Sequence, residues 1–280
     1  MPRSAGDYAL SRLVLATAYW LRPPRTRWFP HLVIRIVRDR LSRPHPMPSL
    51  DRIQPKPPGL AGLATDLGTD AVLAGFRGGF YPQGHWGAMK WWSPPIRAVM
   101  LLENVHIAKR FRRTLRGADM RVAFDTDFSG VLDGCAAPRG KRLHVTWITP
   151  CARALYKRLF AEGHAHSVEI YDAENHLVGG LFGVAAGPVF SALSMFHTAD
   201  NASKFAIVSL YHHLEARGFV AVDHQVMSGW VAALGGTEMP RQDYVVLLGR
   251  TGTPDAGRWS TEFTLGQTAD WQPANRPADS

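Results

Sequence analysis

The sequence has few cysteines, no long apolar run and little acid near its start. Its two cysteines, Cys135 and Cys151, have no CxxC spacing and no matching histidine pattern, so neither a disulfide framework nor a zinc site is indicated. No stretch reaches the roughly 18 uninterrupted apolar residues that span a bilayer, and residues 1–6 lack the apolar core of a secretory signal. We therefore expect a cytoplasmic protein with no integral membrane span.

Common catalytic and metal-binding signatures are also missing. The sequence contains no G-x-x-x-x-G-K-[ST] loop, no strand-linked G-x-G-x-x-G and no G-x-S-x-G elbow. His164 and His166 lack a third ligand at suitable spacing, and His212 and His213 fall on neighbouring helix faces that cannot converge on one ion. We expect no metal site. With 280 residues, of which 46% are hydrophobic, the chain can nevertheless bury a sizeable core.

The positive charge is concentrated in the first 58 residues. These contain eleven arginines and lysines against three aspartates, which leaves little of the net charge of +9 for the remainder. Apolar residues recur at helical spacing over 8–21 and 28–41, and this pattern indicates two basic amphipathic helices. Such helices can lie on a membrane surface, on RNA or on the protein's own body. Residues 42–59 are rich in proline and predict a stiff linker, so residues 1–58 are predicted to form a basic extension.

A second cationic segment spans residues 105–116, where Ile107, Phe111 and Leu115 share one helix face. The remaining positions hold five cations and no acid, which indicates either a solvated face or contact with phosphate. The cations are Lys109, Arg110, Arg112, Arg113 and Arg116.

Strand and helix patterns elsewhere predict a mixed sheet flanked by helices. Trp91 and Trp92 precede a proline pair and are expected in an extended or turn segment, as a stacking platform or as part of an interface. Gly179 and Gly180 indicate a bulge or the close approach of a ligand, and Asp200 is a candidate cap for the helix that follows it. We expect helices over 69–76, 151–163 and 201–217, strands over 120–125, 188–196 and 243–249, a hairpin over 166–187, and a loose tail over 251–280.

Asp223 and Gln225 lie in the apolar segment 218–225, which has the character of a buried strand. A period of two places their side chains on one face and His224 on the other. The two residues either carry chemistry, or Asp223 caps a turn and Gln225 satisfies nearby backbone groups.

Ten motifs, occurring in order between about Gly59 and Gly249, resemble those of the leucyl/phenylalanyl-tRNA protein transferases. They are GGFYP, WWSPPIR, TWIT, GHAHSVEIYD, LVGGLFGV, SMF, NASK, DHQV, LGG and PRQDY. The resemblance implies an α/β (α+β) fold without a cofactor, in which residues 59–104 form a small N-terminal domain. Residues 105–250 would form the acetyltransferase-like (GNAT-like) mixed-sheet domain that carries out aminoacyl transfer.

The resemblance also implies an activity and a site. Members transfer Leu or Phe, and we include Met as a further donor, from aminoacyl-tRNA to the N-terminal α-amine of an acceptor protein. The matching residues are Asp223 and Gln225 for the amine, and Trp92 and Trp147 for the terminal adenosine and aminoacyl end. Leu181, Phe190, Leu193, Ser194, Met195 and Phe196 match the substrate pocket, and the basic residues of 109–116 match the part that meets the tRNA acceptor stem.

Leu193 stands where the family usually has Glu, so we expect weak selectivity for acceptors with a basic N-terminal residue. Glu169 and Asp200 are the nearest alternative acids. Two other functions compete: a divergent paralogue that binds aminoacyl-tRNA without transfer, and a transferase for a different acceptor, such as a small amine or a lipid. DNA is not an expected partner, and peripheral membrane contact would involve the extension.

Overall fold

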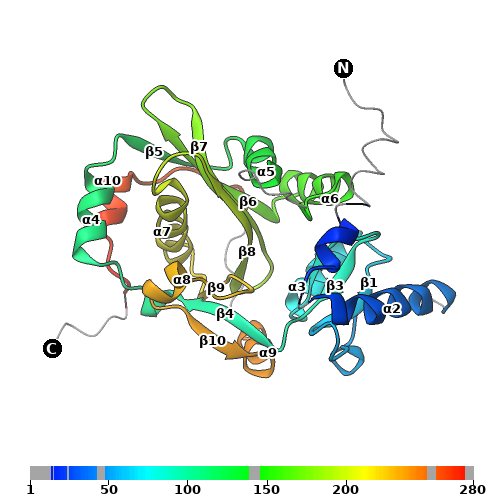
Figure 1. Cartoon of the computed structure of the whole chain (residues 1–280). Helices are drawn as coiled ribbons and strands as arrows, with labels where there is room; N and C mark the ends of the chain where they lie inside the picture. The colour runs from blue at the N-terminus through cyan, green and yellow to red at the C-terminus, as the bar shows by residue number, and fades with distance from the viewer. Residues whose placement is uncertain are drawn as a thin grey trace, which may run out of the picture. The chain divides into compact units, whose positions relative to one another are not determined.

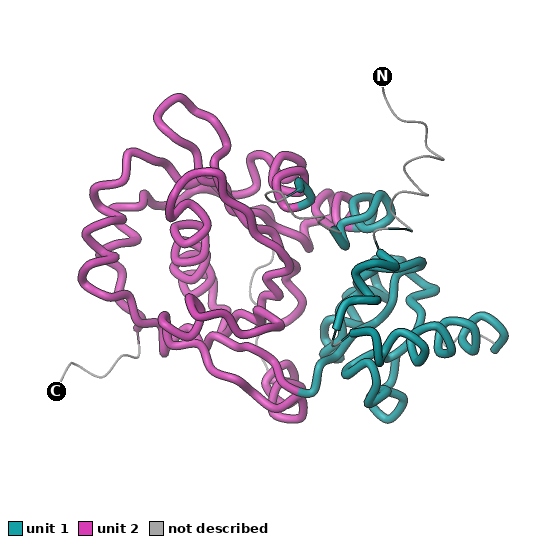
Figure 2. The backbone as a smooth tube through the Cα atoms, in the orientation of Figure 1, with its two compact units in different colours: residues 1–95, 136–155 teal, residues 96–135, 156–280 magenta. Residues whose placement is uncertain are grey.

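The computed structural model describes residues 14, 16–23, 25–42, 48–138, 146–250 and 257–274 (Figure 1). The chain divides into two compact units, which Figure 2 shows in different colours. The first unit comprises residues 1–95 and 136–155, and the second comprises residues 96–135 and 156–280. Within the described residues, no helix combines the length and apolar character needed to cross a membrane.

The first unit is built on a small antiparallel sheet with strand order β1-β3-β2. Trp91 and Trp92 lie in β3, so of the two predicted conformations, extended or turn, the extended one is present. The Trp91 ring packs on α3, where a Cβ built on Gly75 would lie 2.6 Å from it, so only glycine allows this approach. The elements are η1 (Arg25–Trp28), α2 (Phe29–Leu41), η2 (Leu50–Arg52), β1 (Leu60–Leu63), α3 (Thr69–Arg77), β2 (Tyr81–Gln83) and β3 (Lys90–Trp92).

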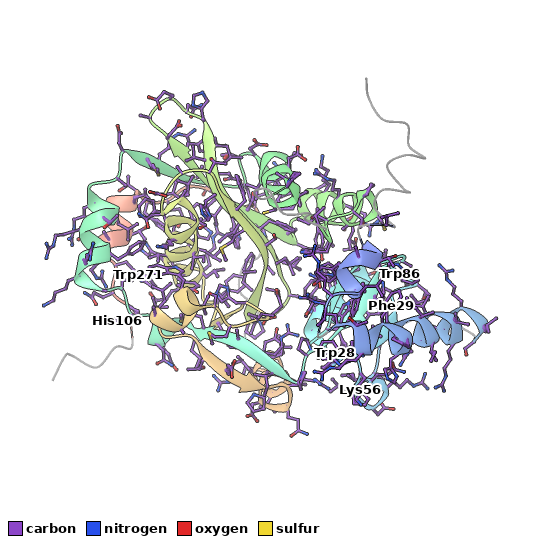
Figure 3. All side chains as sticks on the ribbon, in the orientation of Figure 1. Trp28, Phe29, Lys56, Trp86, His106 and Trp271 are labelled. Atoms are coloured by element: carbon purple, nitrogen blue, oxygen red, sulfur yellow. The ribbon has the colours of Figure 1, made fainter. Side chains whose placement is uncertain are left out.

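Helix α2 of the predicted extension packs against this sheet. Leu32 and Ile36 on its inner face join Trp20 and Leu60 in one buried cluster. Phe29 and Trp86 meet edge to face beside the cluster, with ring centroids 5.5 Å apart (Figure 3). The basic helix therefore belongs to the same compact unit as the sheet, because its apolar face supplies part of that unit's core.

The second unit contains a seven-stranded mixed sheet with strand order β10-β4-β9-β8-β7-β6-β5. Neighbouring strands are antiparallel except β8 and β9, which run parallel and are joined through helix α7. The strands are β4 (Ile96–Leu101), β5 (Met120–Phe124), β6 (Ala165–Asp172), β7 (Leu177–Ala185), β8 (Val189–His197), β9 (Ala221–Asp223) and β10 (Thr237–Pro240).

Helices cover both faces of the large sheet, so the predicted α/β (α+β) class is confirmed. Helix α7 packs against β6, β7 and β8, and its buried side chains form part of the main core (Figure 1). The helical elements are η3 (Leu102–Asn104), α4 (Lys109–Arg116), α5 (Phe128–Ala136), α7 (Ala202–Ala216), α8 (Gly229–Ala233), α9 (Arg241–Leu248) and α10 (Leu265–Asp270). Helix α6 (Pro150–Ala161) begins in the first unit and ends in the second.

The prediction of a final strand over 243–249 is wrong, because these residues form helix α9. Its buried residues Tyr244, Leu247 and Leu248 recur at spacings of three and four, while Val246 between them is 72% exposed. That spacing belongs to a helix, although the adjacent valines favour a strand. The strand that pairs with β4 is instead the preceding segment, Thr237–Pro240.

Two local predictions at the start of α7 also have definite outcomes. The prediction of an Asp200 cap is wrong, because the N-cap is Asn201, in a left-handed conformation with no side-chain cap hydrogen bond. The bulge at Gly179 is confirmed by a register shift opposite Ile170. The close neighbour is α7 itself, since a Cβ built on Gly179 would lie 2.5 Å from the Cβ of Ala202.

The prediction of a loose tail is wrong for residues 257–274. Trp259, Leu265 and Trp271 are buried in the main core, and α10 begins with a capping box formed by Thr264 and Gln267. The polar composition of the segment concealed the few apolar residues that hold it. The remainder of the predicted tail, 251–256 and 275–280, lies outside the described residues.

Arg112 fastens this C-terminal segment to α4. Its Nη1 donates hydrogen bonds to the carbonyl oxygens of Ala269 at 2.5 Å and Trp271 at 2.7 Å, and its Nε donates to Ile107 at 3.1 Å. The side chain is buried, and a guanidinium is well suited to several carbonyl acceptors at once.

We expect Arg112→Ala to lower the free energy of unfolding by about 2 to 3 kcal/mol, because it removes charged hydrogen bonds and leaves buried carbonyls unpaired. Arg113→Ala, at the exposed neighbouring position, is the matched control and should change stability by less than about 0.5 kcal/mol. Urea unfolding measures both. Equal stability of the two variants would contradict the structural role of Arg112.

Candidate active site

A buried ion pair lies at the end of β9. Asp223 is fully buried, and its carboxylate pairs with Arg97 of β4, which is 1% exposed. Arg97 Nε lies 3.2 Å from Asp223 Oδ1, its Nη2 bonds Oδ2, and the Tyr244 hydroxyl donates to Oδ2 at 3.3 Å. Burial raises the pKa of Tyr244, so this phenol stays a donor at neutral pH. The carboxylate is therefore held by two strands and one helix.

Gln225 follows in a tight turn. Its φ of 60° lies in the left-handed region, and its backbone N–H donates to Asp223 Oδ1 at 2.9 Å. Its Nε2 donates to the carbonyl oxygen of Ala192 in β8 at 3.1 Å. The prediction that Asp223 and Gln225 project from one strand face is wrong, because β9 ends at Asp223. The turn, rather than strand periodicity, directs the Gln225 side chain.

The sequence left open whether Asp223 and Gln225 have structural roles, and these contacts show that both do. Asp223 caps the turn, and Gln225 satisfies a backbone carbonyl. The half-buried amide oxygen of Gln225 nevertheless accepts no hydrogen bond within the described part of the chain. The turn thus combines a fixed carboxylate with an amide oxygen that remains available to a ligand.

His224, between Asp223 and Gln225, contacts helix α7. Its Nε2 is 2.7 Å from the hydroxyl of Tyr211 in α7. Burial lowers the pKa of His224 to about 4, so the imidazole is neutral near pH 7. The histidine therefore links the turn to α7 without adding charge to the site.

The predicted substrate residues divide into two groups. Leu181, Phe190 and Met195 belong to the main core on the α7 side of the sheet, where Leu181 pairs in register with Met195. Leu193 is 9% exposed and stands at a register irregularity between Ala192 and Ser194. The other residues of the set are Ser194, opposite Phe182, and Phe196, opposite Gly180.

The two predicted tryptophans lie in the first unit. Trp92 packs beside the core cluster of that unit, and its Nε1 donates to Gln83 at 3.3 Å. Trp147 is half-buried and comes shortly before α6, where the hydroxyl of Thr149 accepts a hydrogen bond from the backbone of Ala152 at 3.1 Å. The WWSP and TWIT motifs thus carry local structural functions as well as aromatic surface.

Helix α4 does not present all five of its cations to solvent. The prediction that Arg112 binds tRNA is wrong, because its buried guanidinium is committed to the C-terminal segment. Arg116 is exposed and pairs with Asp270. Lys109, Arg110 and Arg113 are exposed, and within the described ranges no carboxylate pairs with them.

Glu169 is a buried acid whose burial the sequence did not indicate. It is fully buried on β6 and accepts hydrogen bonds from Ser167 Oγ at 2.5 Å, Thr126 Oγ1 at 3.1 Å and the Asp127 backbone at 3.3 Å. Burial raises its pKa to about 7 despite these bonds. The chain itself thus surrounds Glu169, which leaves it poorly suited to bind an acceptor.

One exposed group in the described chain has metal-ligand geometry. Asp172, Glu174 and His176, at the turn between β6 and β7, bring their ligand atoms within 4.8 Å of one another. Exposed acidic turns commonly have this arrangement without an ion, and His176 already contacts Asp172 at 3.3 Å. We assign it no function.

Comparison with known proteins places the chain among enzymes of one reaction class. A family profile described as "Leucyl/phenylalanyl-tRNA protein transferase" matches residues 99–249. A protein of that name from Pseudomonas syringae pv. syringae is 40% identical over 76% of this chain and 93% of its own length. Another, from Shewanella baltica, is 37% identical over 78% of this chain and 92% of its own length.

Among solved structures, "The structure of L-PGS from Bacillus licheniformis" aligns with 56% of this chain and 66% of its own, at 9% identity and a TM-score of 0.38. This similarity is too low to bear on fold or function. The matches to family and relatives, in contrast, define the class of the protein as an aminoacyltransferase. The chain belongs to the leucyl/phenylalanyl-tRNA protein transferase family.

The raised pKa of Glu169 predicts a pH dependence of stability. The folded state keeps the proton up to about pH 7, whereas the unfolded carboxyl loses it near 4.5. The contribution of Glu169 to the free energy of unfolding is therefore fully present below pH 4.5. By linkage, it falls by about 3 kcal/mol as the pH rises to 7. We expect Glu169→Gln to lack this slope in denaturant unfolding across the interval.

The exposed substitution Glu162→Gln is the control and should retain the slope. A constant stability difference between wild type and Glu169→Gln across pH 4.5 to 7 would mean that burial does not hold the proton.

Proposed function

We propose that this chain transfers Leu or Phe from aminoacyl-tRNA to the N-terminal α-amine of acceptor proteins and so forms a peptide bond. The observation that carries the proposal is the turn from Asp223 to Gln225, fixed by Arg97, in a chain that belongs to the transferase family. The tagging of proteins for degradation through their N-terminus is the implied outcome.

The reaction requires positioning more than covalent catalysis. An aminoacyl ester is already activated, so transfer needs an uncharged α-amine held near the ester carbonyl and a stabilised oxyanion. We assign the amine to Gln225, whose amide oxygen can accept one of its N–H hydrogens. Asp223 acts through Gln225, because its carboxylate is committed to Arg97, Tyr244 and the turn.

The donor side chain is assigned to the apolar group formed by Leu181, Phe190 and Met195. Leu181 and Phe190 are almost fully buried, so admission of Leu, Phe or Met requires these side chains to change position. An apolar environment of this composition disfavours polar side chains, because burial there would cost them their hydrogen bonds to water. The remaining proposed contacts are Ser194 and Phe196 on the same strand, and Trp92 and Trp147 as stacking surfaces for the terminal adenosine.

Acceptor selectivity is assigned to the position of Leu193. An aliphatic side chain there provides no charge-assisted partner for an N-terminal Arg or Lys, and such contacts are worth about 1.5 to 3 kcal/mol. Glu169 does not replace the missing acid, because it is surrounded by its own hydrogen bonds. We therefore propose weak discrimination between basic and neutral N-termini.

We propose a cytoplasmic location, because aminoacyl-tRNA and newly made proteins occur together there. We also propose that the protein contacts membranes peripherally, through the basic extension rather than through a spanning helix.

We expect Gln225→Ala to lower transfer of Leu by about 10² to 10⁴, the usual range for a residue that positions a reacting proton. Val226→Ala, at the exposed neighbouring position, should transfer at the wild-type rate. The measurement is mass spectrometry of peptides incubated with charged Leu-tRNA. Wild-type protein that binds Leu-tRNA but modifies no peptide would instead indicate a binding paralogue.

Helix α4 provides a test of tRNA binding. We expect Lys109→Ala, Arg110→Ala and Arg113→Ala, combined, to weaken binding of charged and uncharged tRNA alike. The salt dependence should flatten by roughly one unit of slope for each phosphate that the variant no longer neutralises. Fluorescence titration over a salt series measures both effects, and a slope equal to that of the wild type would show that α4 does not contact tRNA.

A further inference from the structure

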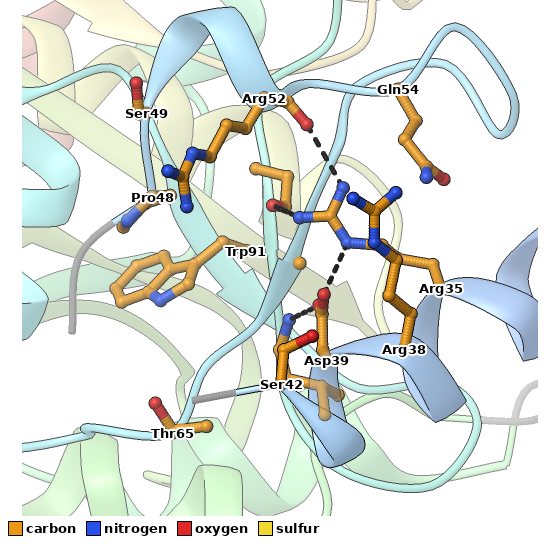
Figure 4. A pocket seen from close by; sticks show the side chains of 13 residues that line it. Arg35, Arg38, Asp39, Ser42, Pro48, Ser49, Arg52, Gln54, Thr65 and Trp91 are labelled. Atoms are coloured by element: carbon orange, nitrogen blue, oxygen red, sulfur yellow. Dashed lines mark hydrogen bonds and ion pairs between the residues drawn. The ribbon is translucent and has the colours of Figure 1, made fainter. Parts of the chain in front are cut away.

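A polar pocket of about 510 Å³ lies in the first unit, between α2, η2 and β1. Figure 4 shows three arginines, Arg35, Arg38 and Arg52, around it. Asp39 is the only carboxylate among the lining residues, so the pocket carries an excess of positive charge. Such a pocket attracts anions.

Arg35 builds the pocket rather than filling it. Its guanidinium pairs with Asp39 at 2.8 Å and donates to the carbonyl oxygens of Arg52 at 3.1 Å and Ala61 at 2.5 Å (Figure 4). These bonds join α2 to η2 and β1. Arg38 and Arg52 are exposed, and in the described part of the chain no acceptor binds their guanidinium groups. Two cationic donors are therefore available to a ligand.

Two further polar atoms of the lining residues are buried without a partner. The indole N–H of Trp91, a residue that is 1% exposed, has no acceptor within the described residues, and Gln54 Oε1 has no donor there. Buried polar groups normally find hydrogen bonds, so these two atoms of lining residues remain unsatisfied.

An apolar groove of about 430 Å³ adjoins this pocket and shares Arg38 and Ser42 with it. The groove follows the outer face of α2, where Ile34, Val37 and Leu41 recur at spacings of three and four. Their exposed fractions are 63%, 50% and 84%. The inner face of α2 is already packed on the sheet, so this stripe is a second apolar face with no partner among the described residues.

We propose that α2 and its pocket bind an anionic phospholipid at a membrane surface. The headgroup phosphate occupies the pocket between Arg38 and Arg52. Ile34, Val37 and Leu41 enter the adjacent acyl boundary. Phosphatidylglycerol carries such an anionic phosphate and is the probe lipid.

The apolar stripe favours a lipid over an RNA backbone as the occupant. RNA phosphates need cations, but they offer nothing to three exposed aliphatic side chains one helical turn apart. A bilayer accepts cations and aliphatic side chains at adjacent depths of its surface. The binding site lies wholly within the first unit, so the proposal does not depend on the transfer chemistry assigned to the second.

The experiment is flotation of the full chain with two kinds of vesicle, phosphatidylcholine alone and phosphatidylcholine mixed with phosphatidylglycerol. We expect binding to the mixed vesicles only. Arg38→Ala/Arg52→Ala should lower partitioning about thirty-fold, since each basic residue at an anionic surface contributes about 1 kcal/mol. Ile34→Ser/Leu41→Ser should lower it about ten-fold by removing apolar insertion.

The matched control is Arg77→Ala/Lys157→Ala, which removes the same charge from exposed positions outside both surfaces. Its partitioning should stay within about three-fold of the wild type, and transfer of Leu in vesicle-free solution should be unchanged in all three variants. If the wild type does not transfer Leu, this result contradicts the proposed function but not the lipid assignment.

Any of three results would overturn the lipid assignment. They are an equal loss of vesicle binding in the charge control, equal binding to both kinds of vesicle, and no binding to either. Retained vesicle binding with weakened tRNA binding in Arg38→Ala/Arg52→Ala would assign the pocket to RNA instead. A wild-type dimer that Ile34→Ser/Leu41→Ser converts to a monomer, without vesicle binding, would assign the stripe to a second copy of the chain.

Discussion

The second unit depends on the ion pair between Arg97 and Asp223. Burying two charges is costly unless each finds the other and further hydrogen bonds, and here Tyr244 and the backbone of Gln225 provide those bonds. The pair thereby ties together β4, β9 and α9, which come from distant parts of the chain. The turn that carries Gln225 inherits its rigidity from this pair, so the geometry of the site follows from an interaction that no ligand needs to touch.

The sequence predicts helices and strands correctly where the local residue pattern agrees with the tertiary environment. Helix α7 and the hairpin of β6 and β7 form where the sequence predicts them, and almost every position in the two strands is buried. Val245 and Val246 favour extended backbone and predict a strand, whereas burial of Tyr244 and Leu248 stabilises helix α9. Composition likewise failed for residues 257–274, where two tryptophans outweigh the surrounding polar residues.

The candidate site was predictable in its residues but not in their roles. Motif resemblance located Asp223 and Gln225, yet nothing near them in sequence identified Arg97 as a partner more than a hundred residues away. In helix α4, too, the sequence does not assign the role of a residue, because Arg112 and Arg113 are identical and adjacent. Only the position of the C-terminal carbonyls distinguishes a buried clamp from an exposed cation.

The position of Trp259 and Trp271 in the main core has a consequence for biosynthesis. Both side chains, together with Leu265 and Ala269, complete a core whose other members begin at Met100. A chain emerging from the ribosome in order would therefore hold an incomplete core, with an uncovered apolar surface beside α4 and α7, until those late residues have left the exit tunnel. Nascent chains of this protein would need protection over that interval, and truncation before Trp259 would make the exposure permanent.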